Sequence, residues 1–105
     1  MERDFTYVDD IVDGFISAIN SDLKFEIINL GNGNPIKLMD FIIALEKKIG
    51  KPAIKNYVEM QQGDVKSTNA DITKAKNLLN FNPRVSLSEG VSNFVDWYID
   101  YYGIK

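Results

Sequence analysis

Residues 25–35 read FEIINLGNGNP, a short and almost continuously apolar run followed by a turn rich in Gly and Asn. Such a run is typical of a strand that is covered on both faces, and the Gly, Asn and Pro residues mark a loop. A helix with apolar residues at helical spacing is predicted from Leu38 to Ile49, ended by Gly50, and a second strand at 53–60. The order strand–helix–strand predicts a right-handed parallel crossover, so the fold class is α/β.

Before this unit, residues 3–8 form an alternating polar and apolar stretch that is rich in aromatic and β-branched side chains. This pattern predicts a short strand or an extended entry. A helix is expected to follow up to about Asn20. Either Asp9 or Asp10 could cap it, because a carboxylate accepts orphan N–H groups and complements the positive end of the dipole.

The C-terminal half predicts two more helices. Residues 61–70 are polar and aperiodic and indicate a surface loop, after which Asp71 caps a short helix. Ser86-x-x-Glu89 forms a capping box for the last helix. The side chains expected to face inward on these two helices are Ile72, Ala75, Leu78, Leu79, Val91, Phe94, Val95, Tyr98 and Tyr102. The sequence thus predicts about four helices but only two or three short strands. This sheet is thin for so many helices, which indicates that a larger sheet is missing.

The composition excludes several classes of protein. The chain has 105 residues, a net charge of −3 and no basic cluster, so nucleic acid is not an expected partner. No apolar run is long enough to span a membrane and no signal peptide is visible, so we expect a cytoplasmic protein. Cys and His are both absent, which removes thiolate and imidazole metal ligands and any Ser-His-Asp triad. We therefore expect no metal site and no self-contained enzyme.

Three patterns have simpler explanations than catalysis. Tyr101 and Lys105 have the Tyr-x-x-x-Lys spacing of a dehydrogenase base, but Gly103 stands between them and would end a helix. The Gly31-Asn32-Gly33 turn lacks the third glycine of a dinucleotide fingerprint, which favours a plain strand-to-helix turn over a phosphate site. Helix capping accounts for the paired Asp9 and Asp10 better than acid–base chemistry does.

Five blocks, in order and covering essentially the whole chain, resemble the C-terminal third of the extended short-chain dehydrogenase/reductase superfamily of NAD-dependent epimerases and dehydratases. Within it, the chain is most similar to the bacterial UDP-glucuronate 4-epimerases. The blocks are RDFTYVDD at 3–10, NLG at 29–31, MQQGDV at 60–65, AD at 70–71 and FVDWY at 94–98. The resemblance implies that residues 1–105 form one small substrate-binding subdomain of an extended Rossmann-type epimerase, without its N-terminal NAD-binding domain.

In that family NAD removes and returns a hydride at C4 of a UDP-sugar, and a Tyr-x-x-x-Lys pair with a Ser or Thr does the proton chemistry. The resemblance implies that all of these groups lie upstream of this segment. No catalytic or cofactor-binding residue is therefore expected here, and NAD would belong to the intact enzyme.

The resemblance does imply roles in binding a UDP-sugar. Arg3 matches the family's arginine on the diphosphate, and its guanidinium suits phosphate oxygens. Asp64 matches the acid that accepts hydrogen bonds from the ribose hydroxyls. Gln61 stands where many galactose-type epimerases carry a second arginine, so it supplies an amide without a charge. Tyr7 could approach the substrate or belong to the core.

Three functions stay open at this point. The first is a UDP-glucuronate-type 4-epimerase portion that is not catalytic alone and binds UDP-sugar weakly in isolation. The second is part of a related nucleotide-sugar dehydratase or galactose-type epimerase, and the third is a non-catalytic binding or interaction module. Because its helices carry more apolar surface than a thin sheet can cover, we also expect the isolated chain to self-associate.

Overall fold

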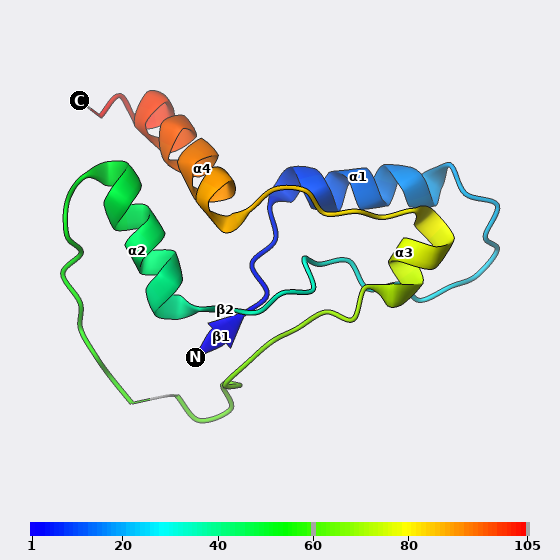
Figure 1. The fold of residues 1–105 in the computed structure, drawn as a ribbon, viewed down its shortest axis with the longest axis horizontal. Helices are drawn as coiled ribbons and strands as arrows, with labels where there is room; N and C mark the ends of the chain where they lie inside the picture. Colours follow the sequence, from blue (N-terminus) through cyan, green and yellow to red (C-terminus); the bar gives the residue numbers. More distant parts are fainter. Residues whose placement is uncertain (60, 105) are drawn as a thin grey trace.

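The computed structural model describes residues 1–59 and 61–104. The four helices and the thin sheet predicted from the sequence are confirmed (Figure 1). The elements in chain order are β1 (Glu2–Arg3), α1 (Val8–Ile19), β2 (Ile36–Lys37), α2 (Leu38–Ile49), α3 (Thr73–Leu79) and α4 (Leu87–Tyr102).

The ends of two helices follow the predicted signals, α2 at Gly50 and α4 at Ser86. α2 stops at Gly50, which is left-handed with φ 83°. The Ser86 hydroxyl accepts the N–H of Glu89 at 3.2 Å and so caps α4. Local side-chain chemistry therefore sets these boundaries. The predicted cap of α3 by Asp71 is wrong, because the N-cap is Ile72 and makes no side-chain cap, although Asp71 Oδ1 accepts the N–H of Thr73 at 3.1 Å.

The predicted capping of α1 by an aspartate is wrong. Its N-cap is Tyr7, which makes no side-chain cap, and Asp9 and Asp10 lie inside the first turn. Asp10 is only 4% exposed, and its two carboxylate oxygens accept the N–H groups of Arg84 and Val85, each at 3.1 Å. It therefore ties α1 to the segment that enters α4, because a buried carboxylate needs donors and finds them there.

The strands are not where the sequence predicts them. β1 pairs antiparallel with β2, with Glu2 opposite Lys37 and Arg3 opposite Ile36, and Glu2 also forms an isolated parallel bridge with Ser67. Residues 25–30 and 53–59 run without a strand assignment, and Met60 lies outside the described residues. A strand needs a partner edge, and among the described residues no backbone hydrogen bond joins either segment to another one. The predicted parallel crossover is therefore absent from the described part.

The helices pack in two pairs within a flat molecule that measures 48 × 36 × 18 Å. α1 lies against α3, and α2 against α4 (Figure 1). The buried cluster consists of Ile72, Ala75, Leu79 and Phe81, with Ile28, Leu30 and Ala70 packed onto it, and Val91 and Val95 are buried on α4.

Four side chains predicted to face inward are instead at least 41% exposed. They are Leu78, Phe94, Tyr98 and Tyr102. The radius of gyration, 16.4 Å, exceeds the value of about 13 Å expected for a compact domain of roughly 100 residues. The described residues thus form no second layer over these side chains. Among the helices of the described residues, none is long and apolar enough to cross a membrane.

Candidate functional site

β1, which carries Arg3, is hydrogen-bonded to the segment that follows the loop of Gln61 and Asp64. The N–H of Glu2 donates to the carbonyl of Lys66 at 2.7 Å, and the N–H of Thr68 donates back to the carbonyl of Glu2 at 3.2 Å. On its other side, β1 pairs with β2. The segment 66–68 is thereby fixed beside the residue that precedes Arg3, and the loop of residues 61–65 ends next to the start of the chain.

The loop that carries Gln61 and Asp64 is a tight turn. The N–H of Asp64 donates to the carbonyl of Gln61 at 3.1 Å, and Gly63 has φ 92°. Because this backbone angle is strained for any residue with a Cβ, glycine suits the turn. Both site side chains are exposed on it, so they are open to a ligand.

Arg3 lies half-buried on β1, and among the described residues no carboxylate forms an ion pair with it. Its Nη1 donates to the carbonyl of Glu2 at 2.8 Å. The described residues contain no ion pair between Arg3 and either Asp4 or Asp9. A guanidinium has five N–H donors, so this side chain keeps donors and a full positive charge for an anion.

Tyr7 takes a different environment. It precedes α1, and its ring packs against the first turn of α4, where a Cβ placed on Gly90 would lie 3.1 Å from Tyr7 Cδ1. The ring is half-buried. This position matches the core role that the sequence left open for Tyr7, and its contact with substrate stays a prediction.

Asp4 is the polar residue that sequence reasoning missed. Its Oδ2 accepts the N–H groups of Gly33 at 3.0 Å and Ala70 at 2.9 Å, and its Oδ1 accepts that of Asn32 at 3.2 Å. The only sequence signal was its place directly after Arg3. Asp4 instead joins the N-terminal entry, the glycine turn and the segment before α3.

The bonds of Asp4 also decide the role of the Gly31-Asn32-Gly33 turn. Two of its N–H groups are already donated to a carboxylate, and negative charge stands where a phosphate would have to sit. A Cβ on Gly31 would lie 2.6 Å from the Cβ of Ala70, so glycine is required for this close approach. The turn is structural, as the sequence favoured.

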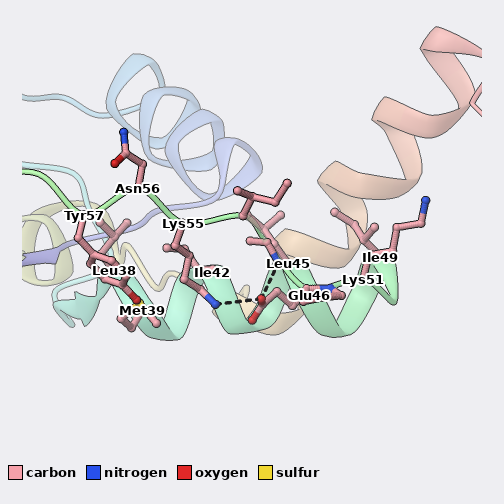
Figure 2. Close-up of a pocket in the computed structure, with 13 residues that line it drawn as sticks. Leu38, Met39, Ile42, Leu45, Glu46, Ile49, Lys51, Lys55, Asn56 and Tyr57 are labelled. Carbon is pink, nitrogen blue, oxygen red and sulfur yellow. Dashed lines mark hydrogen bonds and ion pairs between the residues drawn. The ribbon is translucent and has the colours of Figure 1, made fainter.

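A groove runs along α2 and is closed by the segment of residues 51–57 (Figure 2). Its lining is mainly apolar, with Leu38, Ile42 and Leu45 along the helix. At its edge, Glu46 Oε2 accepts the N–H of Ala53 at 2.7 Å and pairs with Lys55 Nζ at 3.3 Å. These two bonds, the N–H of Ala53 foremost, lower the pKa of Glu46 below its ordinary value. Glu46 thus anchors the segment that leads to the turn of residues 61–64.

Acidic residues do not gather into a metal site. In the parts of the chain that the structure covers, no group of three or more Asp and Glu side chains is arranged to hold a metal ion.

Comparison with known proteins identifies relatives along nearly the whole chain, although no family model matches it. An uncharacterized protein of Methanocaldococcus jannaschii is 48% identical over 95% of this chain and 31% of its own length. The UDP-glucuronate 4-epimerase of Thermodesulfobacterium geofontis is 50% identical over 90% of this chain and 29% of its own length. The chain thus spans about a third of the length of the curated relatives it matches.

Solved structures share the fold as well. The UDP-glucuronic acid 4-epimerase of Bacillus cereus, in complex with UDP-glucuronic acid and NAD, matches with a TM-score of 0.89 at 40% identity, over 96% of this chain and 33% of the relative. In these relatives the matching segment is the C-terminal part. The chain is therefore similar, over nearly all of its length, to the C-terminal part of NAD-dependent epimerases, the UDP-glucuronate 4-epimerases among them.

Proposed function

We propose that this chain supplies the UDP-sugar-binding side of an NAD-dependent 4-epimerase of the UDP-glucuronate type and has no catalytic activity alone. The observation that supports the proposal is the hydrogen bonding of Glu2, next to Arg3 on β1, to residues 66 and 68, which follow the loop of Gln61 and Asp64. The similarity to a relative crystallised with UDP-glucuronic acid and NAD supports the choice of ligand.

Each predicted residue has chemistry that suits one part of a UDP-sugar. The unpaired guanidinium of Arg3 would donate charge-assisted hydrogen bonds to the diphosphate. The exposed carboxylate of Asp64 would accept hydrogen bonds from the ribose hydroxyls, and the amide of Gln61 would donate to phosphate or sugar without adding charge. Tyr7 would contribute by packing at the start of α1 or by reaching the sugar from there.

The chemistry of epimerisation is assigned to the upstream part of the enzyme. Tyr101 lies in α4, and the helix ends at Gly103, which is left-handed with φ 62°. Tyr101 and a residue beyond this cap cannot share a rigid helical face, and Lys105 lies outside the described residues. The only glycine-rich turn with dinucleotide-like spacing gives its N–H groups to Asp4, so the residues present do not fit NAD. In the intact enzyme NAD supplies the hydride chemistry, and this chain would orient the nucleotide.

The test is a calorimetric titration with UDP. The protein titrated is this chain fused behind the N-terminal two thirds of the Thermodesulfobacterium geofontis enzyme. Arg3→Ala should weaken binding by about 1.5–3 kcal/mol, roughly tenfold to a hundredfold, because a charge-assisted contact is lost. Asp64→Ala should weaken it by about 1–2 kcal/mol, because the ribose hydroxyls can still be hydrated.

The matched control is the other arginine of the chain, Arg84, which is exposed on the segment entering α4. Arg84→Ala should leave the affinity for UDP unchanged. The proposal fails if the Arg3 and Asp64 variants both bind UDP as tightly as the parent fusion protein.

A further inference from the structure

The register of β1 against residues 66–68 gives Lys66 the same face of the strand pair as Arg3. Ser67 forms a parallel bridge with Glu2. Residues opposite each other in a sheet point to the same face, and neighbours along a strand point to opposite faces. Glu2 and Ser67 therefore share one face, and the alternation assigns Arg3 and Lys66 to the other.

The guanidinium of Arg3 is turned toward this same edge. Its Nη1 donates at 2.8 Å to the carbonyl of Glu2, and that oxygen also accepts the N–H of Thr68 at 3.2 Å. The hydroxyl of Thr68 in turn accepts the N–H of Asp4 at 3.1 Å. The charge of Arg3 thus lies at the carbonyl that holds the segment carrying Lys66.

Neither cation is neutralised within the described part of the chain. The ion pairs found there involve other lysines, and Lys66 is exposed. The whole chain has a net charge of −3, so Arg3 and Lys66 do not belong to a generally basic surface. Because two neighbouring positive charges repel each other, this arrangement favours a ligand with more than one negative charge.

We propose that Lys66 supplies a second positive charge for the diphosphate of a UDP-sugar. Each of the two phosphate groups carries a negative charge, whereas Arg3 offers one positive charge and Gln61 none. Lys66 lies two residues after Asp64, and its ammonium is a point charge on a flexible stem that can reach a phosphate oxygen. This role rests on the proposed function and completes its diphosphate contact.

The test is a calorimetric titration of the fusion protein with UDP. Lys66→Gln should weaken binding about threefold to tenfold at about 0.1 M salt, because an exposed charge contact is partly screened. At about 1 M salt, where the screening length falls to about 3 Å, parent and variant should differ by less than about twofold. Lys66→Arg keeps the charge and should retain the affinity of the parent. A loss that salt does not reduce, or that Lys66→Arg does not restore, would overturn the proposal.

Lys37 is the matched control. It is exposed and lies opposite Glu2 in β2, so the alternation assigns it to the face away from Arg3. Both lysines border a pocket that Glu2 and Ser67 also line, so the two substitutions decide which face the ligand uses. Lys37→Gln should leave the affinity for UDP unchanged. Equal losses with Lys37→Gln and Lys66→Gln would show a general effect of surface charge and contradict the assignment.

A second ligand separates the diphosphate from the sugar. UDP-glucuronate carries a further anion, the carboxylate of its sugar. Lys66→Gln should weaken the binding of UDP and of UDP-glucuronate by the same factor. A loss confined to UDP-glucuronate would assign Lys66 to the sugar carboxylate and refute the diphosphate contact.

The variants also separate this contact from the proposed function. If Lys66→Gln binds UDP as tightly as the parent while Arg3→Ala binds it more weakly, Lys66 has no such role and the proposed function stands. If Arg3→Ala, Asp64→Ala and Lys66→Gln all bind UDP like the parent, the proposed function fails as well.

Discussion

The carboxylate of Asp4 accepts the backbone N–H of Ala70 at 2.9 Å, across 66 positions of the chain. The same side chain accepts the N–H groups of Asn32 and Gly33. One carboxylate thus adds a second set of bonds between three segments that the short β1 also links through β2 and residues 66–68. The site depends on this junction, because Asp4 follows Arg3 directly.

Asp4→Asn should destabilise the fold. An amide NH₂ must then face at least one of the three N–H donors, and hydrogen bonds to a charged acceptor contribute about 1.5–3 kcal/mol. We expect the free energy of unfolding in urea to fall by about that amount. Hydrogen exchange at Ala70 should become faster.

Asp9→Asn is the control, because Asp9 is exposed on α1 and its substitution removes one negative charge, as Asp4→Asn does. It should change the free energy of unfolding by less than about 0.5 kcal/mol. Equal effects of the two substitutions would show that Asp4 acts through net charge and not through its hydrogen bonds.

Gly31→Ala should also be costly. The new methyl group would lie 2.6 Å from the Cβ of Ala70 and 3.0 Å from Asp4 Oδ2, and both atoms are fixed by the junction. Overpacking of this kind costs about 1–3 kcal/mol. Thermal or urea unfolding measures the loss, and the double change Gly31→Ala with Ala70→Gly should recover part of it. If Gly31→Ala leaves the free energy of unfolding unchanged, the junction around Asp4 can widen to accept the new methyl group.

The hydrogen bond from the Ala53 N–H to the Glu46 carboxylate should be sensitive to acid. Its pKa in the folded chain is lowered from the ordinary value of 4.5 by the N–H of Ala53 and by Lys55. A lowered folded pKa means that the contact contributes stability above pH 4.5 and loses it as the pH falls through the folded value. Exchange of the Ala53 amide, relative to its intrinsic rate, should rise in that acid range.

Glu46→Gln should abolish the acid dependence of exchange at Ala53, because an amide does not titrate. Glu59→Gln is the control, since Glu59 is exposed and no pairing of its side chain is seen in the described part. If the parent and Glu46→Gln lose protection at the same pH, another group controls this segment.

Local signals were sufficient for the helices and insufficient for the strands. The Ser86 cap and the Gly50 cap act within a few residues, so the sequence alone predicts where α4 begins and where α2 ends. Residues 25–30 have the right composition for a strand, but a strand forms only with a partner edge. The roles of Asp4 and Asp10 were missed for a related reason: their donors lie 28 to 75 positions away, beyond any local pattern.

The isolated chain should self-associate. Phe15 and Ile27 are apolar and exposed, and without the N-terminal portion only another copy can cover them. Light scattering should show the mean mass rising with concentration, and Phe15→Asp should reduce that rise while Tyr101→Asp should not. A monomer at millimolar concentration would contradict this expectation.

The central claim is that this chain acts only together with an NAD-binding portion. The most direct measurement incubates UDP-glucuronate with the isolated chain and NAD, or with the fusion protein, and separates the C4 epimers by chromatography. The account predicts epimerisation by the fusion protein and none by the isolated chain beyond a heat-killed control. Turnover by the isolated chain, or none by a fusion protein that holds NAD and binds UDP, would contradict it.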